Sequence, residues 1–248
     1  MEKEKSATHV IAKAQSGLLH QGLKNWQGRK EWFFNRKNTD TYELYYEGPY
    51  KRAEKWQKKV LEQLVSQDKR VNTLLEFGCG TTRFTRWWAE IGIEATGGDI
   101  SPFMLSQAMH RFGGDLVMAD SHHMPFKDHS FDALAFVTTF EYYKDPVKVI
   151  REAARVGKYG IVMGMMNKIT PKFIRRRTQQ FFGKNPFYET ARFYTPKTLI
   201  AVIDEALKGR KYTVEWTTTG LPKWFPVQQW NLPVGDFFGL YVQFKDVD

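Results

Sequence analysis

Two glycines and two acids occur where strands are expected to end, and these residue types suit a nucleotide-like ligand. Gly78 and Gly80 follow the apolar run that ends at Phe77, and glycine lets a ligand approach the main chain closely. Asp99 comes about 20 residues later, the spacing at which a βαβ unit holds a ribose diol. Asp120 ends the next apolar segment. Parallel strands bind ligands at their carboxyl edge, so we expect one common site. The alternative is an ordinary glycine-rich turn without a ligand.

The elements that would position these residues alternate between strand and helix. Leu74, Leu75 and Phe77 form a short apolar run bounded by glycine, which is typical of a strand buried on both faces. Thr81 or Thr82 is expected to cap the following helix, and free backbone N–H groups at that turn would face the ligand. Further strands are expected at residues 95–100, 115–120, 131–137, 159–165, 214–216 and 238–244.

Four ordered signatures carry a family resemblance. They read LLEFGCG (74–80), DISPFML (99–105), VMAD (117–120) and MPFKDHSFD (124–132). In this order the chain resembles the class I S-adenosylmethionine-dependent methyltransferases, most of all the small-molecule, type 11-like members. The resemblance is strong over about residues 70–167 and weak at both ends. One difference is Thr82, which stands where the family often has a third glycine.

The resemblance implies an α/β fold with a Rossmann-like, doubly wound, seven-stranded and mostly parallel sheet. It implies a single domain, residues 1–248. Within it we expect four parts: an N-terminal extension of helices that acts as a lid (1–68), a cofactor-binding core (70–167), a substrate cap inserted after the fifth strand (168–198), and the last helix and strands (199–248).

The cofactor implied by the resemblance is S-adenosyl-L-methionine. Asp99 would hold the ribose, and Asp120 would accept a hydrogen bond from the adenine amine. The lid residues expected near cofactor or acceptor are Tyr46, Tyr50 and Arg52. The full set of expected cofactor-binding residues is Tyr50, Glu76, Gly78, Cys79, Gly80, Asp99, Ile100, Ser101, Met104, Asp120, Ser121, His122 and Thr138.

Two residues after the fourth strand are candidates for catalysis. Glu141 or Tyr143 would orient or deprotonate the acceptor. For Glu141 the equal alternative is capping of the next helix, whose dipole favours an acid at that end. The Asn/Asp-Pro-Pro-aromatic motif of amide and nucleobase methyltransferases is absent here, where the chain reads TTFE. This absence disfavours such nitrogen atoms as acceptors.

The cap is basic with interleaved aromatic residues. Arg175, Arg176 and Arg192 are the expected substrate-binding residues, because guanidinium groups clamp carboxylates and phosphates. A solvated helix face is an equally good interpretation of these charges. The resemblance implies in-line methyl transfer to a small acceptor, and the charges of the cap make an anionic acceptor one version of this prediction.

Composition and charge bear on the cellular compartment and on the ligands that the chain can bind. The chain has 248 residues and a net charge of +10, and the excess positive charge lies in residues 1–70 and 168–248. Its one cysteine, Cys79, excludes an intrachain disulfide and fits a reducing cytoplasm. The sequence contains neither an 18-residue apolar run nor an N-terminal signal pattern. The His122–His123 pair lacks companions at metal-ligand spacing, so no metal site is expected.

Three other functions remain open from the sequence. The basic flanks would suit an RNA-directed methyltransferase, although no appended RNA-binding module is recognisable. A nicotinamide oxidoreductase would also use a Rossmann-like core, but the third glycine of its turn is missing, because Thr82 stands in that place. A non-catalytic module that binds S-adenosylmethionine would keep the pocket without turnover. Oligomeric state and the atom that receives the methyl group are not encoded in any motif.

Overall fold

The computed structural model describes residues 31–47, 50–183, 186–220 and 229–247. Its centre is one sheet with the strand order β3-β2-β1-β4-β5-β8-β6-β7. The first five strands in this order run parallel, whereas β8 is antiparallel to both β5 and β6. The strands are β1 Thr73–Phe77, β2 Glu94–Asp99, β3 Leu116–Met118, β4 Phe131–Val137, β5 Gly157–Met166, β6 Tyr212–Thr219, β7 Gln229–Trp230 and β8 Phe237–Phe244.

The α/β, doubly wound architecture expected from the sequence is confirmed, but the sheet has eight strands where seven were expected. The additional strand is β7, which pairs with Thr218 and Thr219 at the end of β6. The sequence pattern predicts no strand between β6 and β8. A two-residue strand has no periodicity of its own, so only its pairing with β6 reveals it.

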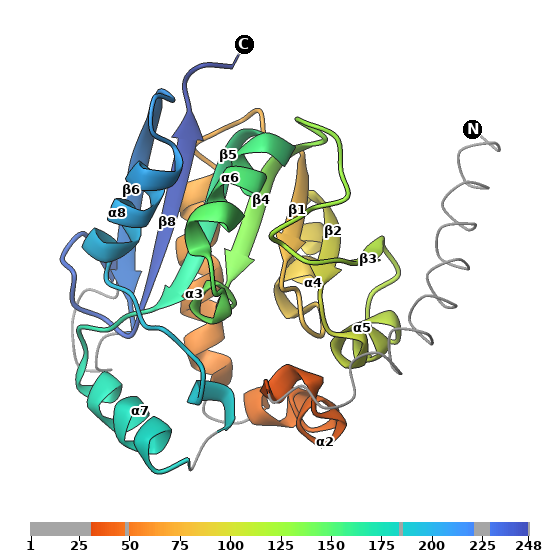
Figure 1. The fold of residues 1–248 in the computed structure, drawn as a ribbon, viewed down its shortest axis with the longest axis vertical. Coiled ribbons are helices and arrows are strands. Elements are labelled where there is room, and N and C mark those ends of the chain that lie inside the picture. Colours follow the sequence, from red (N-terminus) through yellow and green to blue (C-terminus); the bar gives the residue numbers. More distant parts are fainter. Residues whose placement is uncertain (1–30, 48–49, 184–185, 221–228, 248) are drawn as a thin grey trace.

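Helices cover both faces of the sheet (Figure 1). On β4, Leu134 and Phe136 belong to one apolar core, while Ala133, Ala135 and Val137 belong to the other. This alternation explains why the strand reads as a continuous apolar run. The first core is shared with α6 (Pro146–Val156) and α8 (Pro196–Ala206), and the second with α3 (Tyr50–Val65) and α4 (Arg83–Glu90).

The chain changes direction across the sheet between β1 and β4. From β1 it proceeds outward through β2 to β3, and it then returns to form β4 on the other side of β1. Such a switch point leaves a crevice at the carboxyl ends of the two strands, because the helices that follow them lie on opposite faces. The strand order therefore places the crevice at the ends of Phe77 and Val137.

The N-terminal extension and the cap both lie at this carboxyl edge. Figure 1 shows α2 (Arg36–Asp40) and α7 (Pro171–Phe181) beyond the ends of β4 and β5. The described part of the extension also contains two short 3-10 helices, and the cap contains another after α7. These segments are η1 Trp32–Phe34, η2 Glu43–Tyr46 and η4 Pro186–Tyr188.

The sequence predicted the N-caps of two helices beside the crevice, and the structure confirms one of them. Ser101 caps α5 (Pro102–Met109) by accepting a hydrogen bond from the Met104 amide at 3.2 Å, as its position before Pro102 predicts. The expected cap on α4 is wrong. Thr82 stands at the N-cap position in a left-handed conformation, and its hydroxyl bonds the Thr81 carbonyl oxygen instead. This conformation explains why glycine suits that position.

The described residues contain no helix that is both long and apolar enough to cross a lipid bilayer.

Candidate active site

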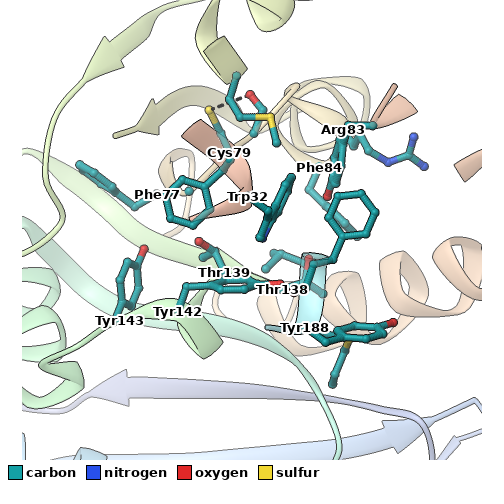
Figure 2. A pocket seen from close by; sticks show the side chains of 18 of the residues that line it. Trp32, Phe77, Cys79, Arg83, Phe84, Thr138, Thr139, Tyr142, Tyr143 and Tyr188 are labelled. Atoms are coloured by element: carbon teal, nitrogen blue, oxygen red, sulfur yellow. Dashed lines mark hydrogen bonds between the residues drawn. The ribbon is translucent and has the colours of Figure 1, made fainter. Parts of the chain in front are cut away.

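A cavity of about 1100 Å³ opens at the switch point. Its floor comes from the carboxyl ends of β1, β2 and β4, and its walls come from the N-terminal extension and the cap. Figure 2 shows Thr138 and Thr139, at the end of β4, close to Trp32 of the extension and Tyr188 of the cap. This volume is slightly above the range of about 300–1000 Å³ that is typical of small-molecule pockets.

The glycine turn leaves no space for side chains at its first position. Gly78 has φ +74°, and a Cβ there would overlap the side chain of Thr139. Gly80 has φ +54°, and a Cβ there would lie 3.9 Å from the Met104 sulfur, so its surroundings are more open. The expectation of free amides at this turn is wrong. The Gly78 and Cys79 amides both donate to the Gly98 carbonyl oxygen, and the Gly80 amide donates to Asp99.

Asp99 joins the glycine turn to the start of α5. Its Oδ2 accepts a hydrogen bond from the Gly80 amide, and its Oδ1 accepts one from the Ser101 amide, both at 2.8 Å. The side chain is buried, and burial raises its pKa to about 6. Asp99 therefore lines the cavity as a held, oriented carboxylate at neutral pH.

Two further acids line the same cavity in different electrostatic states. Burial raises the pKa of Glu76 to about 8, although the Thr85 hydroxyl donates to its Oε2 at 2.6 Å. Burial would also raise the pKa of Asp120, but hydrogen bonds from the His122 amide and ring lower it below its usual value. At pH 7, Asp120 is an acceptor, whereas most Glu76 side chains carry a proton.

The structure brings most of the expected cofactor-binding residues to this cavity, and Ser101 is an exception. Ser101 is fully buried away from it, because its hydroxyl caps α5 and bonds the Phe33 carbonyl oxygen. The side chain of Tyr50 lies outside the described part of the structure. The residues that do line the cavity are Glu76, Gly78, Cys79, Gly80, Asp99, Ile100, Met104, Asp120, Ser121, His122 and Thr138.

Cys79 contributes a small side chain rather than a reactive thiol. It is buried, and burial together with the nearby acids Asp99 and Glu76 raises the pKa of its thiol well above the usual value. A thiol in such surroundings stays protonated and is a poor nucleophile.

Glu141 has neither of the two roles that the sequence suggests. It does not line the cavity, and α6 is capped by Asp145, which accepts from the Lys148 amide at 3.0 Å. Instead, the Glu141 carboxyl group is fully buried, and its Oε1 accepts from the Met166 amide at 2.9 Å. Its backbone oxygen accepts from the Arg192 amide at 2.7 Å. Glu141 thus joins the end of β5 to the cap.

Tyr143 does line the cavity. Its ring packs edge-on against Phe136 and Phe140. Its hydroxyl group is buried near Ser121 and Thr139 but makes no hydrogen bond of good geometry. Burial raises the pKa of the phenol far above 10. Tyr143 can therefore donate a hydrogen bond to a ligand at neutral pH, but it cannot act there as a phenolate base.

An aromatic wall faces the strand ends, and Tyr46 is the member that the sequence singled out. Trp32 stacks on Tyr42 with ring centroids 5.3 Å apart, and Phe187 of the cap packs edge-on against Trp32 at 4.6 Å. The density of aromatic residues in the extension was the only sequence signal for this wall. Its members that line the cavity are Trp32, Phe33, Tyr42, Tyr46, Tyr142, Phe187 and Tyr188.

Arg83 connects the wall to the core. Its Nη1 lies 3.0 Å from the Glu43 carboxylate, its Nη2 pairs with Glu54, and its guanidinium group lies 3.9 Å from the centre of the Tyr46 ring. Because Arg83 begins α4, these contacts hold the extension against the segment that follows the glycine turn. Arg83 itself lines the cavity.

Cations gather at the end of the cavity formed by the cap. Lys172, Arg175, Arg176 and Arg192 all line it, as does Arg52 of α3. Lys172 pairs with Asp236. One buried guanidinium nitrogen, Nη1 of Arg176, has no hydrogen-bond partner among the described residues. The expected substrate-binding residues Arg175, Arg176 and Arg192 therefore line one cavity, and Tyr46 lines it as well.

Comparison with known proteins shows which proteins this chain resembles. Residues 75–163 match the family described as methyltransferase domain. An uncharacterised protein of Methanocaldococcus jannaschii is 34% identical over 134 residues, which are 53% of this chain and 62% of that protein. The demethylmenaquinone methyltransferase of Thermotoga maritima is 31% identical over 133 residues, which are 52% of this chain and 55% of that enzyme. The chain thus spans less than two thirds of these curated relatives.

A solved structure agrees on the fold. A methyltransferase from Thermotoga maritima, described as a SAM-dependent enzyme and possible histamine N-methyltransferase, superposes with a TM-score of 0.67. The match covers 85% of this chain and 98% of that structure at 23% identity. Residues 75–163 thus match a methyltransferase domain, and the chain has the fold of this S-adenosylmethionine-dependent methyltransferase structure.

The glycine turn gives a first prediction. Gly78→Ala should lower the free energy of unfolding by about 2–5 kcal/mol, because a positive φ and an overlap with Thr139 act together. Gly92→Ala is the matched control, since Gly92 also has a positive φ of +91° but has no atom within 4 Å of the added Cβ. The control should lose only about 1–2 kcal/mol in urea unfolding. Equal losses would contradict the tight packing of the turn.

Glu141 gives a second prediction, on pH. Its pKa is about 7 in the folded protein because it is buried, against an ordinary value of 4.5. The folded state therefore holds this proton more tightly, and the resulting stability is complete below pH 4.5 and lost as pH rises to 7. Glu141→Gln does not titrate. Relative to the wild type, the variant should gain about 2 kcal/mol between about pH 5 and pH 8.

Urea unfolding of both proteins across this pH range measures the difference. Asp145→Asn serves as a control for general effects of removing a nearby acid. A stability difference between wild type and Glu141→Gln that stays constant with pH would show that Glu141 is not a buried, protonated group.

Proposed function

We propose that this protein transfers a methyl group from S-adenosyl-L-methionine to a small acceptor. The observation that carries the proposal is the convergence of the glycine turn, Asp99 and Asp120 on one cavity. The match of residues 75–163 to a methyltransferase domain supports the same reaction class. The activity of the whole protein remains a proposal, because the chain spans only part of its relatives.

The residues at the strand ends fit the chemical groups of the cofactor. In our proposal Asp99 accepts hydrogen bonds from the ribose hydroxyls and Asp120 accepts one from the adenine amine. Glu76 faces the ammonium group, since a cation compensates a buried carboxylate. Gly80 lets the ligand approach the main chain. When bound, S-adenosylmethionine supplies a methyl group that is already electrophilic, because it is attached to a sulfonium.

The protein's contribution is then to orient the acceptor and exclude water. Orientation alone can lower the barrier by about 7–11 kcal/mol. Tyr143 is placed to donate a hydrogen bond to the acceptor, since its hydroxyl group is buried without a partner of good geometry. The aromatic wall would cover the reacting groups and exclude water. Glu141 has a positioning role, because it connects β5 to the cap without reaching the cavity.

We further propose that the acceptor carries an anionic group. The support is the gathering of cations at the cap end, and above all the buried Arg176 nitrogen without a partner. A carboxylate or phosphate there would satisfy it with a charge-assisted hydrogen bond. The demethylmenaquinone methyltransferase among the relatives acts on a quinone, which is consistent with a flat acceptor against the aromatic wall.

Calorimetry with S-adenosylhomocysteine tests the proposal and its pH dependence. Because Glu76 has a pKa of about 8, it must lose its proton when it pairs with the ligand ammonium. Affinity should therefore rise between about pH 6 and pH 8, approaching tenfold for each pH unit. Buffers of different ionisation enthalpy should reveal release of this proton.

Glu76→Gln should bind more weakly at pH 8 and with little pH dependence, because glutamine keeps the bond from Thr85 but cannot ionise. Glu94→Gln is the matched control, since Glu94 is exposed at the start of β2 and at the opposite edge of the sheet. It should behave as the wild type. Undetectable binding of S-adenosylhomocysteine to the wild type would contradict the proposed function.

A further inference from the structure

Large apolar side chains are concentrated on the outside of the cap. Phe181 is 84% exposed and Ile174 is 71% exposed, the two highest values among the large hydrophobic residues that the structure describes. Ile169, Leu232 and Val234 are also exposed. Single exposed apolar residues are ordinary, but a group of them on one surface indicates an interaction site.

The geometry of α7 places the two most exposed residues on one face. Ile174 and Phe181 are seven positions apart, which corresponds to about two helical turns. The neighbouring side of the helix packs on the rest of the cap, where the Phe173 ring lies 5.5 Å from Phe193 and the Gln180 amide donates to the Ala191 carbonyl oxygen. The face with Ile174 and Phe181 is therefore not part of the core of the protein.

The apolar surface continues beyond this helix. The Asn167 side chain donates to the Pro233 carbonyl oxygen at 2.9 Å, and the Ile169 amide donates to the Asn167 side chain at 3.1 Å. Leu232 and Val234, which flank Pro233, therefore lie near the start of α7. Together with Ile169, Ile174 and Phe181 they form the surface that we call the cap surface.

The charge of α7 indicates which partner fits the cap surface. Residues 171–181 contain Lys172, Arg175, Arg176 and Arg177 and no acid. Arg177 and Thr178 lie between Ile174 and Phe181 in sequence and are exposed. A helix that combines exposed aliphatic and aromatic side chains with flanking cations fits the boundary between water and an anionic lipid layer.

A second copy of this chain fits the cap surface less well. It would bring the same arginines against each other, and the chain as a whole has a net charge of +10, so repulsion would oppose the contact. An anionic lipid surface would instead attract the exposed cations of the helix, which are Lys172, Arg175 and Arg177. We propose that α7 docks this protein on the surface of an anionic membrane, with Ile174 and Phe181 in the interfacial region.

Docking would have a consequence for substrate entry, and this consequence alone rests on the proposed function. Lys172, Arg175 and Arg176 of the same helix line the cavity. A docked α7 would hold the cap end of the cavity at the lipid boundary. An acceptor with an anionic headgroup and an apolar tail could then enter from the membrane.

Co-sedimentation with lipid vesicles tests the docking independently of methyl transfer. The full-length protein should sediment with vesicles of phosphatidylcholine and phosphatidylglycerol and should stay in solution with phosphatidylcholine alone. Binding should weaken as salt increases, because part of the attraction is electrostatic. The double variant Ile174→Ser/Phe181→Ser should lose about tenfold or more in partitioning.

Leu44→Ser/Met109→Ser is the matched control. Leu44 is 62% and Met109 50% exposed, and both lie outside the cap and the residues beside it, so this variant should partition as the wild type. Arg177→Gln should reduce binding to anionic vesicles, because it removes an exposed positive charge. Thermal unfolding of each variant verifies that it folds. If wild type and double variant partition equally, or if the double variant instead abolishes self-association in light scattering, the proposal is overturned.

Discussion

The site depends on one buried carboxylate. Asp99 accepts hydrogen bonds from the Gly80 and Ser101 amides at 2.8 Å each, and it thereby connects the turn after β1 to the helix after β2. Neither segment would keep this position through its own backbone bonds alone, because turn amides need partners once they are buried. Burial raises the Asp99 pKa to about 6, so the connection is made by a carboxylate at neutral pH. The rest of the cavity is assembled around it.

The walls are connected to this centre by a small number of polar contacts. Arg83 pairs with Glu43 of the extension, the Ser101 hydroxyl bonds the Phe33 carbonyl oxygen, and the Tyr142 hydroxyl donates to the Phe187 carbonyl oxygen at 2.5 Å. Each bond joins a core residue near a strand end to the extension or the cap. The geometry of the core therefore determines where the aromatic wall stands, and the wall in turn closes the cavity.

Sequence alone predicts the parts of this arrangement that depend on local pattern. The apolar runs, the Ser101 cap and the acids after β2 and β3 could be read because strand period, capping and strand-end chemistry are local rules. The rest depends on tertiary packing. The sequence did not reveal that the amides of the glycine turn are already bonded, that Glu141 turns away from the cavity, or that Trp32 stacks on Tyr42. Each of these requires contact between segments distant in the chain.

In our proposal one cavity between Asp99, Asp120 and the glycine turn holds the adenosyl group. A crystal structure with S-adenosylhomocysteine would test this placement. We expect ligand density in the cavity, with the ribose hydroxyls within hydrogen-bond distance of Asp99, the adenine amine beside Asp120, and the sulfur facing Tyr143. Density elsewhere in the molecule, or a ribose away from Asp99 within this cavity, would show that the adenosyl group binds in another way.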